Sequence, residues 1–220
     1  MNNRGCEETY KKNAMSEYAN RLNSIERIQR INTPYADTTI AYFSVVEIQK
    51  IFKRDFYFIS AKYICASTEK RIAIDHQLTE VIRFLTRTRS FIESKPKQMS
   101  NLPAIPYEVF LKDTFMVRLL RLFQGIDEIL MMFLGAALEG SIDNKLRLNH
   151  FRKFSSQIVC LKVIATLGDN FFTSNGKIRE LPDSFLSAEQ KVHLSYLKNN
   201  GNYYVNSKLG NNSPTKAIST

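Results

Sequence analysis

The spacing of apolar residues predicts a chain built mostly of amphipathic helices. In residues 13–31, apolar side chains recur close to the helical period, and arginines occupy the other faces. Pro34 ends this pattern, because the residue before a proline is pushed out of the helical region of backbone space. The apolar positions of this first predicted helix are Leu22, Ile25, Ile28 and Ile31.

A second helix is predicted to open at Asp37, whose short acidic side chain can accept hydrogen bonds from free backbone N–H groups. Residues 56–65 either continue this helix or form a strand, because they are rich in aromatic and β-branched residues. The pattern leaves both alternatives open. The apolar positions that support the helix are Ala41, Val45, Ile48 and Phe52.

A third helix is predicted from Ser67 or Thr68 onward. It ends before residues 94–106, which contain three prolines and several polar residues and form the clearest interruption of the chain. The apolar face of this helix consists of Ile74, Leu78, Val81, Ile82 and Leu85.

The second half of the chain begins with the best candidate for a strand, residues 105–111. This segment is short and apolar, and it starts at prolines that suit an edge strand. Asp113 or Thr114 is then predicted to cap a long helix over residues 115–139. After a short turn, another helix is predicted over residues 143–167.

These elements divide the chain into five predicted parts. Residues 1–12 form a flexible N-terminus, residues 13–95 an N-terminal helical region, and residues 96–104 a linker or long loop. Residues 105–197 form a strand-helix-helix region. Residues 198–220 are rich in Asn, Gly and Ser, which predicts a disordered tail.

The charge balance is more informative than the overall composition. Thirty-one Lys and Arg against 21 Asp and Glu give a formal net charge of +10, which favours an anionic partner. Nucleic acid is the first partner to consider. A basic surface without a binding role is an equal alternative on charge alone. Hydrophobic residues at 44% and charged residues at 24% are ordinary for a folded soluble protein.

Several features predict a soluble cytoplasmic protein. Cys6, Cys65 and Cys160 are odd in number and far apart, which favours a reducing compartment, and the last two are predicted to be small buried hydrophobes. Residues 1–12 are charged and lack an apolar run, so no signal peptide is expected. Residues 129–138 are apolar but too short for a membrane span of about 20 residues, so a buried helix is expected.

No local set of residues suggests catalysis or metal binding. His76, His150 and His193 lie far apart, and each is predicted to be a surface or packing residue. Asp127 and Glu128 are adjacent, so on a helix one is expected to be solvated and the other to cap or to pair. We therefore expect no enzyme, no cofactor, no metal and no small-molecule substrate. An enzyme with a site assembled from distant residues is the rival interpretation.

Two groups of cations are the best candidates for a surface that binds double-stranded DNA. The first basic cluster lies near the end of the third predicted helix and in the loop after it. The second lies at the start of the last long helix, whose N-terminus adds partial positive charge. Solvated helix faces are the alternative for both. The candidate residues are Arg83, Arg87, Arg89, Lys95 and Lys97 in the first basic cluster, Lys145, Arg147, Arg152 and Lys153 in the second, and Lys112 at the end of the strand.

The predicted strand suggests a further mode of binding. Two copies of residues 105–112 could pair as an antiparallel ribbon that fits the major groove of DNA. Because one strand is not stable alone, the protein would then be an obligate homodimer. Its outward side chains would include Glu108 and Lys112, but the strand is poor in the Arg, Asn and Gln residues that usually read base edges.

Two sequence patches within residues 25–167 resemble a known family. Pro34-Tyr35-Ala36-Asp37 opens the second predicted helix. In the other patch, Val109-Phe110-Leu111 precedes a helix bearing Asp127-Glu128-Ile129, and Gly140-Ser141-Ile142-Asp143 precedes a basic helix. Together they resemble the AcaB-like transcriptional regulator family of conjugative plasmids and integrating conjugative elements. Thr38-Thr39 stands where that family often has an aromatic pair.

This resemblance implies a mainly α fold with a short β-strand: a strand-helix-helix dimer, related to ribbon-helix-helix proteins, with additional N-terminal helices. It implies a DNA-binding activator of conjugative transfer genes. It also implies that Asp37 is a helix cap and that Asp127 is a polar anchor in a helix pair, and it supplies no catalytic residue. The alternative is a non-catalytic interaction or architectural component of a plasmid transfer or partition assembly.

Overall fold

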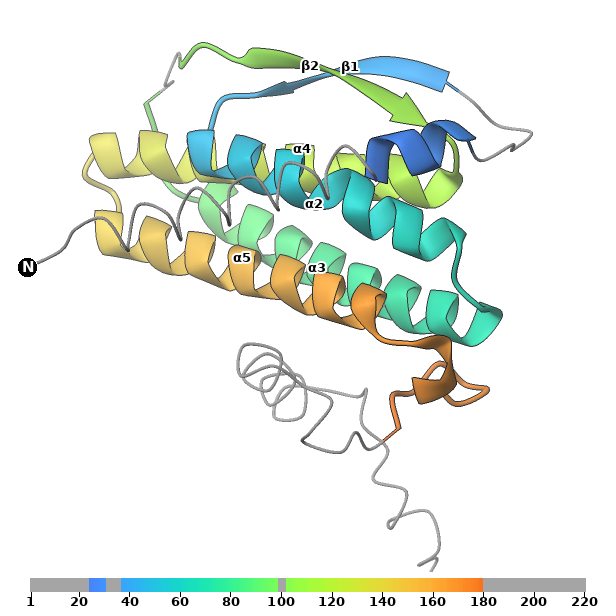
Figure 1. Ribbon diagram of the computed structural model, residues 1–220. Helices are drawn as coiled ribbons and strands as arrows, with labels where there is room; N and C mark the ends of the chain where they lie inside the picture. Colours follow the sequence, from blue (N-terminus) through green and yellow to red (C-terminus); the bar gives the residue numbers. More distant parts are fainter. Residues whose placement is uncertain (1–23, 31–36, 99–101, 180–220) are drawn as a thin grey trace, which may run out of the picture.

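The computed structural model describes residues 24–30, 37–98 and 102–179. Residues 24–30 are helical, and the elements that follow are two strands, four long helices and a short 3₁₀ turn. The helices form two layers, and the two strands form an antiparallel ribbon that covers the layer of α2 (Val46–Ile64) and α4 (Thr114–Leu138) (Figure 1). Helices α3 (Thr68–Glu93) and α5 (Asn144–Thr166) form the layer on the other side.

The first strand corrects two expectations from the sequence. Residues Asp37–Phe43 form β1, not the start of a helix, and the carboxylate of Asp37 accepts a hydrogen bond from the N–H of Thr38 at 2.8 Å instead of capping a helix. The apolar spacing that suggested a helix spans the end of a strand and the start of α2. The physical reason is the alternation of Ala41 and Phe43, which are buried, with exposed Tyr42, which is the period of a strand.

The strand β2 (Ile105–Leu111) lies where the sequence predicts it, but its partner belongs to the same chain. The register pairs Asp37 with Leu111 at one end and Phe43 with Ile105 at the other. The ribbon therefore does not need a second copy to supply its partner strand. The expectation of a ribbon formed by β2 of two copies is wrong for this edge, because β1 occupies it.

The open alternative for residues 56–65 is resolved in favour of a helix, because α2 continues to Ile64. The other three long helices begin where the sequence predicts, and the predicted cap of α4 is confirmed at Asp113. Ser67, Asp113 and Asp143 each accept a hydrogen bond from a backbone N–H in the first turn of α3, α4 and α5, respectively. These caps satisfy N–H groups that have no partner within their helix.

The N-terminus of α2 is capped by a residue far away in the sequence. Asp127 of α4 accepts hydrogen bonds from the N–H of Ser44 at 2.9 Å and of Val45 at 2.8 Å. Burial raises the pKa of the Asp127 carboxyl, while the two backbone hydrogen bonds oppose that shift. The resemblance implied a polar anchor at this residue, and its carboxylate ties the end of β1 and the start of α2 to α4.

One hydrophobic core joins residues from both sides of the predicted linker at 96–104. The long helix α4 lies at its centre, with Phe115, Phe123 and Phe133 almost completely buried. The apolar run 129–138 is helical as predicted and is buried or partly buried except at its end, where Leu138 is exposed. The five-part division remains a prediction, and the predicted flexible N-terminus and disordered tail lie outside the described residues.

Candidate nucleic-acid interface

The fold brings the two basic clusters together at one end of the helical layers. The second half of α3 packs beside the first half of α5 through aromatic side chains. The ring centroids of Phe84 and Phe154 are 4.9 Å apart. The ring centroid of His150 lies 6.2 Å from that of Phe91 and 4.6 Å from that of Phe133 in α4. We call these five residues the aromatic seam.

The loop after α3 is held against the turn between α4 and α5. The N–H of Gln98 donates to the carbonyl of Gly135 at 3.2 Å, and the hydroxyl of Ser141 donates to the carbonyl of Pro96 at 2.6 Å. A Cβ at Gly135 would lie 2.2 Å from the carbonyl oxygen of Gln98, so glycine is required for this approach. The loop therefore positions its two lysines, Lys95 and Lys97, close to the start of α5.

The second basic cluster is available to a partner. Lys145, Arg152 and Lys153 are exposed, and Arg147 is partly buried with its Nε donating to Asn144 Oδ1 at 2.8 Å. Among the described residues, none of these four cations forms a salt bridge. All four lie within the first three turns of α5, and Lys145 and Arg147 lie in its first turn, where the helix N-terminus contributes further positive potential.

The first basic cluster is divided between paired and available cations. Arg83 forms an ion pair with Glu80. Arg89 contacts Glu128 at 2.5 Å and Glu93 at 3.7 Å. The hydrogen bond with Arg89 lowers the pKa of the Glu128 carboxyl and raises the pKa of Arg89. An acid that is distant in the sequence therefore opposes this cluster, because Glu128 approaches it from a different helix.

The remaining members of the first cluster are less restricted. Arg87 is exposed, and no salt bridge involves it within the described ranges. Lys95 places its Nζ 5.3 Å from the centroid of the Phe91 ring. Lys97 donates to the backbone carbonyl of Glu93 at 3.2 Å and keeps its charge unpaired by any carboxylate of the described chain.

Lys112 does not join the other candidate residues. It lies between β2 and α4, at the opposite end of α4 from Phe133 and the aromatic seam. The length of helix between the two positions is roughly 30 Å. Glu108 is exposed on the outer face of the ribbon, as expected, but that face is otherwise apolar, with Ile40 and Tyr42 each 56% exposed.

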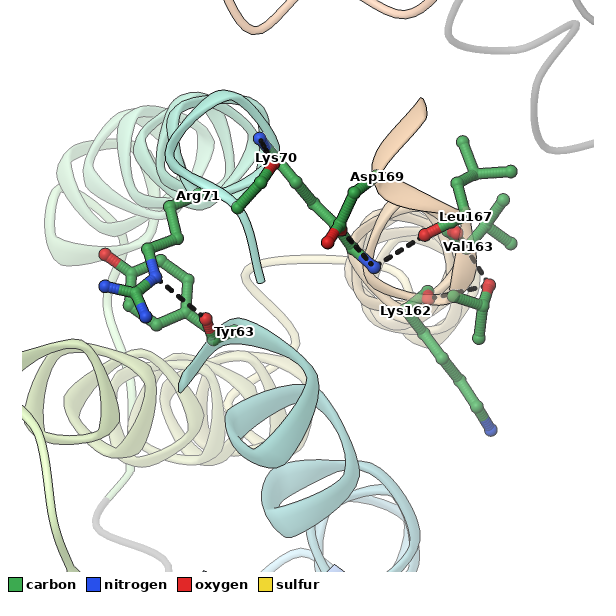
Figure 2. Close-up of polar contacts among 9 residues, drawn as sticks. Tyr63, Lys70, Arg71, Lys162, Val163, Leu167 and Asp169 are labelled. Atoms are coloured by element: carbon green, nitrogen blue, oxygen red, sulfur yellow. Dashed lines mark hydrogen bonds and ion pairs between the residues drawn. The ribbon is translucent and has the colours of Figure 1, made fainter. Parts of the chain in front are cut away.

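Cations at the far end of the helices have structural partners instead (Figure 2). Lys70 is almost fully buried, and its Nζ donates to the carbonyl of Leu167 at 2.5 Å and lies 3.5 Å from Asp169. Burial lowers its pKa, although Asp169 opposes the shift. Arg71 donates to the carbonyl of Tyr63 at 3.2 Å. Lys70 therefore places positive charge at the C-terminus of α5, and Arg71 does so at the C-terminus of α2, where the helix dipole favours it.

His150 is a packing residue, as predicted. Burial lowers its pKa and the charge of Lys153 lowers it further, so the imidazole is neutral at pH 7. Its Nδ1 is buried without a hydrogen-bond partner. His76 is exposed, and His193 lies outside the described residues. The described part of the chain has no group of three His, Cys, Asp or Glu side chains that could hold a metal ion.

The acidic pair Asp127-Glu128 behaves as the sequence predicts, whereas the two described cysteines, Cys65 and Cys160, differ from each other in burial. Asp127 caps a helix and Glu128 is exposed and ion-paired, as expected for adjacent helical residues. Cys160 is buried, and burial raises its pKa to about 12, so it is a thiol at neutral pH. Cys65 is exposed, so the prediction that it is buried is wrong.

The aromatic seam is the part of the site that the sequence analysis missed. Four of its members, on α3 and α5, lie between basic residues in the sequence, and Phe133 lies in the apolar run of α4. The sequence nevertheless contains spacings that indicate the seam. Phe84 and Phe91 are seven residues apart on one helix, and His150 and Phe154 are four residues apart on another. Each pair therefore occupies one face of its helix.

Comparison with known proteins gives a likeness in fold. No protein-family model and no curated protein sequence matches the chain. Among solved structures, the crystal structure of selenomethionine-containing AcaB from uropathogenic E. coli is similar with a TM-score of 0.54 at 12% sequence identity. The match covers 61% of this chain and 78% of that chain. Across the described residues, no helix is both long and apolar enough to cross a membrane.

Proposed function

We propose that this protein is a non-catalytic regulator of transcription that binds double-stranded DNA through the basic end formed by α3 and α5. The observation that carries the proposal is the meeting of two cation clusters more than 40 residues apart in the sequence. Residues 83–97 and 139–153 together contain nine Lys and Arg and three Asp and Glu. A surface of this kind attracts phosphate groups and releases their counterions on binding.

The most direct contacts in this proposal come from the second basic cluster. Lys145, Arg147, Arg152 and Lys153 would bind phosphates beside the N-terminus of α5, whose backbone N–H groups also favour anions. Arg87, Lys95 and Lys97 would extend the surface across the aromatic seam. With about six phosphates engaged, the logarithm of affinity falls against the logarithm of salt concentration with a slope near −5.

The biological part of the proposal is activation of conjugative transfer genes by a homodimer. It is supported by the sequence resemblance to AcaB-like regulators and by the AcaB-like fold. A second copy would double the number of phosphate contacts. The outer face of the ribbon, where Ile40 and Tyr42 are exposed, is the apolar surface that association would remove from water.

Charge reversal tests the proposed DNA surface. The double variant R147E/R152E should lower affinity for duplex DNA by about a hundredfold at low salt, on all sequences alike. The matched control is K177E/R179E, which changes the net charge equally. Its two exposed residues lie near Gly176, which packs against Ile72 at the start of α3 and so at the opposite end of that helix.

Fluorescence anisotropy with promoter fragments would measure both variants over a range of salt concentrations. Circular dichroism would confirm that they remain folded. Equal losses of affinity in the two double variants, or an affinity of the native protein that does not depend on salt, would contradict the proposal.

The same apolar ribbon favours a second candidate function, an interaction component of a plasmid transfer or partition assembly. Ile40 and Tyr42 would then contact a partner protein in place of a second copy. Affinity capture with and without nuclease distinguishes the two functions. Partners that persist after nuclease treatment and are lost in the variant Tyr42→Glu would favour the protein-interaction function.

A further inference from the structure

Phe91 is an exposed aromatic residue in the middle of the basic end. Its side chain is 39% exposed, although the other rings of the aromatic seam are largely enclosed. Arg87 lies four residues before it and Lys95 four residues after it. Arg87 and Phe91 share one face of α3, about 6 Å apart along its axis. Lys95 follows the end of this helix at Glu93, and its Nζ lies 5.3 Å from the centroid of the Phe91 ring. The surface therefore presents a cation, a ring and another cation in a row.

The ring of Phe91 is held in a fixed orientation by its neighbours. His150 lies nearly parallel to it, with an interplanar angle of 18° and a centroid distance of 6.2 Å. Phe133 is also 6.2 Å away, at an angle of 31°. These two rings support Phe91 from within the protein, while the ammonium group of Lys95 lies 5.3 Å from its centroid.

We propose that Phe91 is a stacking site for an unpaired base, so that the basic end binds single-stranded or locally melted DNA in preference to a fully paired duplex. This inference rests on the proposed function, since it names the form of DNA that the same surface prefers. A base would replace the Lys95 ammonium over the ring, and that ammonium and Arg87 would contact the phosphates on either side of the base.

The surroundings of Phe91 favour a nucleic acid over an apolar protein segment. An apolar partner that covered the ring would also remove the neighbouring cations from water without pairing them, which is costly. A single strand of DNA can cover the ring and also pair the cations, because its bases have π faces and its backbone has phosphates. In a paired duplex the base faces are stacked on one another and cannot reach the ring.

The test uses the variant Phe91→Leu, which keeps an apolar side chain and removes the π face. Affinity for a single-stranded oligonucleotide and for a duplex with an unpaired bubble should fall by about tenfold. Affinity for the fully paired duplex of the same sequence should change by less than about twofold. The variant Phe91→Trp retains a stacking surface and should preserve the preference for unpaired DNA.

Phe58→Leu is the matched control. Phe58 also lies under lysine side chains, with the Nζ atoms of Lys162 and Lys62 at 5.4 Å and 5.8 Å from its ring centroid. It contacts the second half of α5, roughly 20 Å along that helix from His150. This variant should leave all three affinities unchanged, and thermal unfolding would verify that both leucine variants are folded.

The outcomes separate this inference from the proposed function. If R147E/R152E abolishes duplex binding while Phe91→Leu affects paired and unpaired DNA equally, or affects neither, the proposed function stands and the stacking site is rejected. If the native protein binds none of the three DNA forms, both are rejected. A selective loss of unpaired DNA in Phe91→Leu, with retention in Phe91→Trp, supports the stacking site.

Discussion

The two basic clusters look equivalent in the sequence, but the structure gives them different surroundings. Arg83 and Arg89 of the first cluster are paired with carboxylates, and one of those, Glu128, comes from α4. The charges of Arg147 and Arg152 in the second cluster meet no carboxylate of the described chain. A run of cations is therefore available to an anionic partner only where the neighbouring helices bring no acids to it.

The contact that joins the two clusters can be broken at Gly135. The variant Gly135→Ala should lose about 2 kcal/mol of unfolding free energy, because its Cβ would collide with the backbone oxygen of Gln98. This loss should occur although alanine is the better helix former. Displacement of the loop should also lower DNA affinity, since Lys95 and Lys97 would leave the start of α5. Urea unfolding and anisotropy measure the two effects.

Gly125→Ala provides the control on the same helix. Its Cβ would approach the Cδ2 atom of Leu85 at 2.8 Å, and this end of a flexible side chain can move aside. Its unfolding free energy should therefore change by less than about 1 kcal/mol. If the two alanine variants were equally stable, the close approach at Gly135 would not be what holds the loop in place.

Removing the carboxylates that pair with Arg89 should give the first basic cluster the unpaired character of the second. The double variant E93Q/E128Q removes the carboxylates beside Arg89 and should strengthen duplex binding by about threefold at low salt, with a steeper salt dependence. The control E47Q/E108Q makes the same change of net charge at exposed positions on α2 and on the ribbon. A gain of equal size in both variants would indicate a general effect of charge and not the release of Arg89.

The seam between the clusters should respond to pH through His150. The folded protein lowers the pKa of this residue by burial and by the charge of Lys153, so the unfolded chain takes up its proton first as pH falls. Stability is therefore lost as pH falls from the ordinary histidine pKa toward the lowered one. The variant His150→Phe should lose less stability than the native protein between about pH 7.5 and about pH 5.5 in urea unfolding. An identical pH dependence would show that His150 does not titrate in this way.

Much of the helical framework could be predicted from local sequence. The helices α3, α4 and α5 begin at Ser67, Asp113 and Asp143, and in each the cap and the apolar period point to the same boundary. The strand β2 was also predictable, because the segment is short and Pro103 and Pro106 at its start disfavour a helix. These features depend on residues that are neighbours in the sequence.

The features that could not be predicted depend on distant residues. The strand β1 was missed because Ala41 and Val45 fit a helical spacing by coincidence, and only the pairing with β2 decides between the two structures. The ion pair of Arg89 with Glu128 links positions 39 residues apart. The resulting division of the first basic cluster therefore follows from how α3 and α4 pack, which no local pattern records.

The cap that Asp127 provides for α2 has a mechanical consequence. The ribbon cannot slide along the bundle without breaking two hydrogen bonds to this one carboxylate. The next residue of α4 is Glu128, which holds Arg89. The strands and α3 are therefore tethered to neighbouring residues of α4, so a displacement of the ribbon reaches the Arg89 ion pair through a single peptide unit.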